Sequence, residues 1–205
     1  MRRYIVFAIS LIMLLGSITT VIATQNIQNY NLRGYADATQ TSDLPYRIPR
    51  LGVNADLFQY DADDLSQHIE WMQDANINWI RQFIYWDEFE PEQGVYQWQD
   101  LDLIMLAIED YPQMQLIPVI MNSPAWARDS DILTAPPTDP QSIRPFLQAF
   151  AERYGEAIDY YQIWDEPNLD DAWGLENPRP AEYTALLSES YRAIHGADAY
   201  ATVIL

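Results

Sequence analysis

Short apolar segments alternate with longer amphipathic segments along the chain from residue 50 onward. None of the short segments alternates cleanly between apolar and polar residues, a pattern typical of strands that are covered on both faces. The sequence therefore predicts five strands, at residues 51–54, 79–83, 115–120, 160–164 and 201–205.

The segments between these strands have the spacing of helices. In the first, Leu65, Ile69 and Met72 recur at intervals of four and three residues after a run of Asp, which suits a helix start. Gly155 and Gly196 are placed to end two of the others. Four helices are therefore predicted, at residues 61–76, 100–110, 142–155 and 180–196.

Repeated βα units of this kind build either a doubly wound sheet or a closed (β/α)8 barrel. A nucleotide-binding doubly wound sheet carries several glycines after its first strand, whereas Gly52 stands alone here. We therefore predict an α/β fold that forms the N-terminal part of a TIM barrel, with about four and a half of its eight βα units. Eight units would need about 150 residues more, so we expect the chain to be a fragment.

The first 23 residues differ in kind from the rest. Arg2 and Arg3 precede the apolar run at residues 4–15, and Ala23 provides a small residue for cleavage. This pattern predicts a signal peptide over residues 1–23, and hence an extracellular or cell-envelope location. Residues 5–23 are also long enough to span a bilayer of about 30 Å, so an uncleaved membrane anchor remains an alternative. We assign residues 24–49 to a polar tether and residues 50–205 to the barrel domain.

Composition narrows the chemistry that the chain can perform. The net charge is −19, which disfavours nucleic acid and anionic membranes as partners. Cysteine is absent and the two histidines, His68 and His195, fall in predicted helices, so thiol chemistry is excluded and a histidine metal site is not favoured. Carboxylates remain the default catalytic groups, and no metal or cofactor is predicted.

Polar and aromatic residues follow the predicted strands, where the active sites of barrels lie. The fourth strand ends in "IWDEPNL", which contains Asp165 and Glu166. This motif resembles the Trp-Asn-Glu-Pro-Asn motif of clan A retaining glycoside hydrolases, most closely those of family 39. The stretches "INWIRQFIYWDEFEPEQGVYQWQDLD" and "IPVIMNSPAWA" are similar to the second and third strands of these enzymes with their loops. The resemblance implies an exported glycosidase for polysaccharide or oligosaccharide, with Glu166 as general acid/base.

A physical argument for Glu166 stands beside the resemblance. Retaining enzymes use two carboxyl groups about 5–5.5 Å apart, one of which must carry a proton. A Glu at an apolar strand end near Trp164 is expected to be desolvated, and desolvation raises the pKa of carboxyl groups. The alternative is that Glu166 caps a helix or pairs with an Arg.

Five further residues are predicted to bind substrate beside Asp165. Arg81 would be a buried charge within a strand, so it needs an anionic partner. The resemblance implies that this partner is the nucleophilic carboxylate, and a structural Asp or Glu is the alternative. Three tryptophans in loops could stack on sugar rings or could pack beneath the loops. The residues concerned are Arg81, Trp86, Asn122, Trp126 and Trp173.

Two departures from the family pattern affect the prediction. Asp165 stands where the family has an Asn whose amide donates to the sugar 2-hydroxyl, and an ionised carboxylate can only accept. Family nucleophiles are a Glu at the end of the seventh strand, so we expect the nucleophile to lie beyond Leu205 and the chain as given to be inactive. The alternatives are a non-catalytic carbohydrate-binding barrel and a barrel enzyme that holds Mg²⁺ or Ca²⁺ through Asp87, Asp165 and Glu166.

Overall fold

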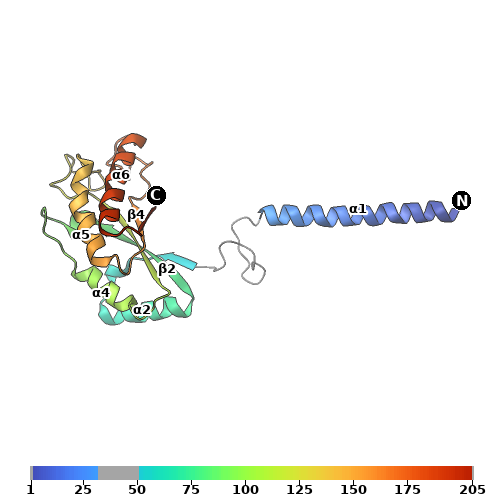
Figure 1. Ribbon diagram of the computed structural model, residues 1–205, viewed down its shortest axis with the longest axis horizontal. Helices are drawn as coiled ribbons and strands as arrows, with labels where there is room; N and C mark the ends of the chain where they lie inside the picture. Colours follow the sequence, from blue (N-terminus) through green and yellow to red (C-terminus); the bar gives the residue numbers. More distant parts are fainter. Residues whose placement is uncertain (1, 32–50, 205) are drawn as a thin grey trace. The chain divides into compact units, whose positions relative to one another are not determined.

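The computed structural model describes residues 2–31 and 51–204. The chain divides into two compact units, residues 1–49 and 50–205. In the first unit, helix α1 (Arg2–Asn31) includes the predicted signal segment and continues through residues 24–31 of the predicted tether (Figure 1). The remainder of the tether lies outside the described residues. Across the described residues, no helix combines the length and hydropathy needed to cross a membrane.

The second unit is a parallel α/β sheet with the strand order β1-β2-β3-β4-β5. The strands are β1 (Leu51–Asn54), β2 (Ile77–Tyr85), β3 (Gln115–Met121), β4 (Tyr160–Ile163) and β5 (Thr202–Ile204). The helices are η1 (Leu57–Gln59), α2 (Ala62–Asp74), α3 (Trp86–Phe89), α4 (Gln99–Ile108), η2 (Pro140–Ile143), α5 (Arg144–Tyr154) and α6 (Pro180–Ala197). All five predicted strands and four predicted helices are present, which confirms the predicted fold class.

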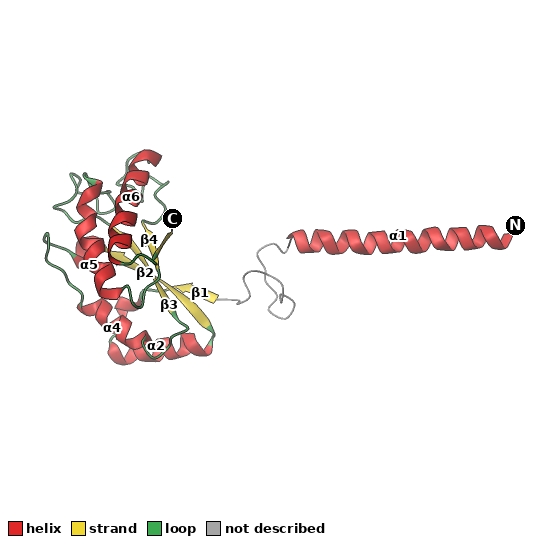
Figure 2. Cartoon of the chain, in the orientation of Figure 1, coloured by secondary structure: helices red, strands yellow, loops and turns green. Residues whose placement is uncertain are grey.

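Helices α2, α4, α5 and α6 cover one face of this sheet (Figure 2). Strand β2 shows the result, because Ile80 and Ile84 are buried while Arg81, Phe83 and Tyr85 on the opposite face are half-buried. The sequence predicted strands covered on both faces, and for β2 this prediction is wrong. Within the described residues only the helices cover the sheet, so the apolar character of Phe83 and Tyr85 does not reflect full burial.

The buried core lies between the sheet and the helices. Its aromatic part centres on Trp98, whose ring packs on Phe146 at 5.7 Å and meets Phe150 and Tyr154 edge-on. Trp98 directly precedes α4, whereas the other three side chains belong to α5. Edge-to-face and offset contacts of this kind add to the free energy gained from burial alone. They fix α5 against the loop that leads into α4.

Candidate active site at the carboxyl ends of the strands

Strands β2, β3 and β4 end at the same edge of the sheet because they are parallel. The register pairs Tyr85 with Met121 and Ile120 with Ile163. The segments that follow these strands therefore emerge side by side, and they contain every predicted site residue except Arg81, which lies within β2.

The backbone bends sharply at this edge. Asn122, Trp164 and Glu166 have positive φ angles of 61°, 68° and 48°. Residues other than glycine adopt this left-handed conformation at an energetic cost, and the surrounding structure must offset that cost. Strand β4 consequently ends at Ile163, one residue earlier than predicted, and Asp165 lies between two bent residues.

Buried contacts of Trp164 hold this bend in place. Its backbone N–H donates to Ile120 O at 2.8 Å, and its indole Nε1–H donates to Ala172 O at 2.7 Å. Its ring also meets Trp173 edge-on, with centroids 5.3 Å apart. The ring is 1% exposed, so Trp164 points into the protein and anchors the turn that presents Asp165 and Glu166.

Arg81 forms an ion pair with Asp165. Its Nη2 donates to Asp165 Oδ1 at 2.5 Å, its Nε donates to Gln162 Oε1 at 2.9 Å and its Nη1 donates to Asn54 Oδ1 at 3.4 Å. The guanidinium thus joins the ends of β1, β2 and β4. The sequence left open whether Arg81 pairs with the nucleophilic carboxylate or with a structural Asp or Glu. In the described structure the partner is Asp165, a structural carboxylate that belongs to the "IWDEPNL" motif.

The environment predicted for Glu166 is wrong. The sequence predicted a desolvated carboxyl beside Trp164, but Glu166 is exposed although Trp164 is buried. The Glu166 carbonyl accepts from Leu169 N at 2.9 Å, which closes a tight turn. Glu166 therefore faces solvent at the strand end, where a ligand could reach it, and it is not paired with Arg81.

The three predicted tryptophans differ in what they can contact. Trp86 and Trp173 are 0% and 1% exposed, so the sugar-stacking role predicted for them is wrong for this structure. Both pack beneath the loops, which is the alternative that the sequence left open. Trp126 is half-buried, and its Nε1 donates to Glu90 O at 3.1 Å. Only Trp126 of the three could offer part of its ring to a ligand.

Glu90 is a buried carboxylate that organises the loop after β2. Its Oε2 accepts from Trp86 Nε1 at 2.6 Å and its Oε1 accepts from Gly94 N at 2.8 Å. Both oxygen atoms are therefore used within the loop. Glu90 shapes the rim of the site without offering a free carboxylate to a ligand.

A polar group between the ends of β2 and β3 joins Asn122 and Asp87, which the sequence singled out separately, to Ser123 and Arg128, which it did not. Asp87 N donates to Asn122 O at 3.2 Å, and Arg128 Nη1 donates to Ser123 O. Burial raises the pKa of the Asp87 carboxyl above its ordinary value, although Arg128 opposes the shift. Among the described residues, Asp87 Oδ1, Asn122 Oδ1 and Ser123 Oγ are buried without a hydrogen-bond partner. These atoms could accept hydrogen bonds from a ligand or from water.

The described residues do not support the alternative of a metal site. Within residues 2–31 and 51–204, no group of three or more His, Cys, Asp or Glu side chains could hold an ion. The carboxylate of Asp165 is instead occupied by Arg81.

Two cavities of the structure lie away from Glu166. One of about 500 Å³ lies between α6 and the loops that follow β3 and β4, and another of about 570 Å³ is lined by residues of α4 and α5 and of the segments that follow them. Neither is lined by Asp165 or Glu166. The candidate site is therefore an open strand end, and its position in the fold, not a pocket, identifies it.

Comparison with solved structures defines the class of fold. The chain aligns with a family 39 glycoside hydrolase from the gut symbiont Bacteroides cellulosilyticus WH2 (TM-score 0.63, 20% identity, 75% of this chain and 30% of that chain). It also aligns with an exo-β-1,4-mannosidase from Opitutaceae bacterium strain TAV5 (TM-score 0.60, 16% identity, 75% and 31%). A β-galactosidase from the psychrophilic Marinomonas ef1 is a third relative in structure (TM-score 0.51, 20% identity, 72% and 27%).

These alignments show that the sheet and its helices match the N-terminal part of a (β/α)8 barrel glycosidase, as predicted. The chain spans about a third or less of the length of each of these three proteins. In sequence, residues 56–139 match the model of a glycoside hydrolase family described as β-galactosidase. A search of curated proteins found no match. The predicted resemblance to barrel glycosidases is therefore confirmed.

Proposed function

We propose that the protein is a glycoside hydrolase that cleaves O-glycosidic bonds of a polysaccharide or oligosaccharide by a retaining mechanism, with Glu166 as general acid/base. The observation that carries this proposal is the position of Glu166, exposed on a strained turn at the carboxyl end of β4. That edge is where barrel enzymes place their reacting groups. The match of residues 56–139 to a glycosidase family supports the same reaction class.

In the first step, protonated Glu166 would donate its proton to the glycosidic oxygen as the bond to the sugar breaks. A second carboxylate, which we assign to none of the described residues, would attack the anomeric carbon and form the glycosyl-enzyme. In the second step, Glu166 would take a proton from water, and the resulting attack would release the sugar and the nucleophile.

Neighbouring residues are proposed to hold the sugar. Asp165 uses Oδ1 for Arg81, so its other oxygen can accept a hydrogen bond from a hydroxyl group. Asn122 offers a buried acceptor without a partner among the described residues, and Trp126 offers part of its ring. Arg81 would act by fixing Asp165.

We further propose that the protein is exported. The charged, apolar and small-residue regions of residues 1–23 support a signal peptide. Western analysis of cell fractions would test this proposal, and a mature protein found only in the cytoplasm would contradict it.

The central test is the variant Glu166→Gln in the full-length protein, assayed on a panel of aryl glycosides. We expect kcat/KM to fall by at least about 100-fold, since general acid/base catalysis contributes factors of that size or more. Glu92→Gln is the matched control, because Glu92 is an exposed Glu in the loop after β2. Equal activity of Glu166→Gln and the wild type would reject the role of Glu166.

A non-catalytic carbohydrate-binding protein is the second candidate function. The Arg81–Asp165 pair favours a binding protein, because it engages the Asp165 carboxylate at the position where the resemblance implies a side chain that contacts the substrate. Calorimetric binding of an oligosaccharide by a full-length protein that hydrolyses no glycoside in the panel would support this candidate.

A further inference from the structure

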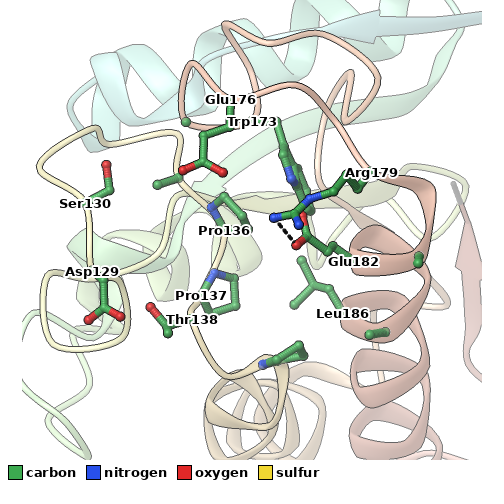
Figure 3. A pocket seen from close by; sticks show the side chains of 15 residues that line it. Asp129, Ser130, Pro136, Pro137, Thr138, Trp173, Glu176, Arg179, Glu182 and Leu186 are labelled. Carbon is green, nitrogen blue, oxygen red and sulfur yellow. Dashed lines mark ion pairs between the residues drawn. The ribbon is translucent and has the colours of Figure 1, made fainter.

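The cavity of about 500 Å³ beside α6 is not used by the proposed reaction. Its walls come from the loop after β3, the loop after β4 and the first two turns of α6. Figure 3 shows Pro136 and Pro137 between Asp129 on one side and the Arg179–Glu182 ion pair on the other. Its volume is in the range of small-molecule sites, about 300–1,000 Å³.

The fold brings these walls close together at Gly174. This residue has φ +72°, and a Cβ built there would lie 2.9 Å from Ala135 Cα. The loop after β4 therefore approaches the loop after β3 more closely than a side chain at position 174 would allow. Thr134 Oγ1 donates to Asp171 O at 2.7 Å and closes the same contact. The contact between the loops after β3 and β4 therefore forms one boundary of the cavity.

The lining combines apolar surfaces with polar groups at the edge. The rings of the half-buried Pro136 and Pro140 provide the apolar surfaces. The polar groups are the carboxylates of Asp129 and Glu176 and the hydroxyls of Ser130 and Thr138, which Figure 3 shows around the proline rings.

The charge of the lining narrows the ligand class. Arg179 is neutralised by Glu182, so the excess charge is negative and anionic ligands are disfavoured. A pyranose ring has two C–H faces and a rim of hydroxyl donors, which suits apolar walls with acceptors around them.

We propose that this cavity is a second saccharide-binding site, separate from Glu166, for an uncharged sugar unit. This second proposal rests on the proposed function only for the class of ligand, a saccharide, since Glu166 takes no part in the binding. Carboxylates of Asp129 and Glu176 accept from sugar hydroxyls, while the proline rings pack on the C–H face of the ring.

Titration of the full-length protein with neutral hexasaccharides tests this site by NMR. The panel contains cellohexaose, mannohexaose and galactohexaose, with hexagalacturonate as the anionic probe. At least one neutral oligosaccharide should shift the Trp173 indole resonance, since Trp173 lines the cavity, and hexagalacturonate should not. This measurement needs no variant. The proposal is wrong if no neutral oligosaccharide shifts Trp173 or if hexagalacturonate binds as tightly as the neutral ones.

A pair of variants on α6 locates the binding. Ala185 lines the cavity and is exposed, so Ala185→Trp fills it without disturbing the core, whereas the exposed Thr184 next to it lies outside the lining. Ala185→Trp should weaken binding at least tenfold, and Thr184→Trp should leave the affinity unchanged. Glu166→Gln should lower hydrolysis and preserve the Trp173 shift. Hydrolysis therefore tests the catalytic role of Glu166, and the Trp173 shift separately tests the saccharide site in the cavity. Equal affinity of Ala185→Trp and the wild type would overturn the cavity assignment.

Discussion

The pairing of Asp165 with Arg81 is the residue-scale feature that most affects the candidate site. The two side chains are 30% and 24% exposed, so the pair is neither buried nor fully solvated. It lies between the two bent residues Trp164 and Glu166, whose backbone conformations cost free energy. The ion pair therefore helps to stabilise the turn that presents Glu166.

Replacing Asp165 by Ala should lower the free energy of unfolding by about 1–2 kcal/mol, between the values for exposed and buried pairs. The loss arises because the Arg81 guanidinium keeps its partial burial and loses its carboxylate. Asp165→Asn should lose less, since its amide oxygen still accepts. Urea unfolding measures both, with the exposed Asp131→Ala as control; an Asp165→Ala midpoint equal to that of the control would contradict the role of the pair.

The raised pKa of Asp87 predicts a pH dependence of stability. Burial makes the folded protein bind a proton more tightly at Asp87 than the unfolded chain does. The tighter proton binding at Asp87 therefore adds to the free energy of unfolding in full below the ordinary Asp pKa of about 3.9. This stabilisation is lost as pH rises through the higher pKa of the folded protein. The ionised carboxylate then destabilises the fold at neutral pH.

Asp87→Asn should accordingly be more stable than the wild type at neutral pH, and the advantage should shrink as the pH approaches about 3.9. Chemical unfolding at a series of pH values measures this difference, and the exposed Asp131→Asn serves as control. A variant less stable than the wild type at neutral pH would show that backbone hydrogen bonds to the Asp87 carboxyl and the charge of Arg128 together outweigh the effect of burial.

At the scale of elements, the loops after β3 and β4 are held by contacts between loops as well as by the strands. Buried Trp164 and Trp173 pack together, and Gly174 lies against Ala135. Trp173, which the sequence assigned to the ligand, is thus part of the scaffold that shapes the loops. These contacts hold the loop after β4 against the loop after β3.

Gly174→Ala tests this scaffold. The left-handed backbone costs about 1–2 kcal/mol for a residue with a side chain, and the contact with Ala135 adds about 1–3 kcal/mol of overpacking. Gly94→Ala is the matched control, because Gly94 has φ +80° and no atom within 4 Å of a built Cβ. Thermal unfolding should show a larger loss for Gly174→Ala, and equal losses would mean that the loop contact is not tight.

At the scale of the whole molecule, negative charge dominates. The chain carries 30 acidic and 11 basic residues, and self-repulsion of this net charge opposes the compact state. Ion pairs join α4 to α5 and α5 to α6, and others connect residues three apart at or within α6, but most involve side chains that are substantially exposed and contribute little.

Salt should therefore stabilise the protein. Raising the ionic strength from about 0.01 M to about 1 M shortens the Debye length from about 30 Å to about 3 Å, which screens the repulsion. The melting temperature in NaCl should rise over this range, and KCl at equal ionic strength should give the same rise if screening is the cause. A falling melting temperature would mean that ion pairs outweigh repulsion.

The sequence by itself determined the order and type of the elements. The apolar runs and the helical spacing of residues such as Leu65 and Ile69 arise from local burial, which periodicity records. The "IWDEPNL" motif likewise located Glu166 at a strand end, because a strand and the residue that follows it are contiguous in the chain. The Arg in β2 indicated a carboxylate partner, although the sequence did not say which.

Only the tertiary structure decided which side chains face outward and which partners they choose. Trp164 is buried and Glu166 is exposed although they lie two residues apart, and the positive φ at each leaves no signal in the sequence. Arg81 met Asp165, 84 residues further along the chain, because the parallel sheet separates β2 from β4 by a single strand. Trp86 packs on Trp126 and Phe146, and Trp173 packs on Tyr183 of α6, so their burial depends on residues distant in the chain that no local pattern could indicate.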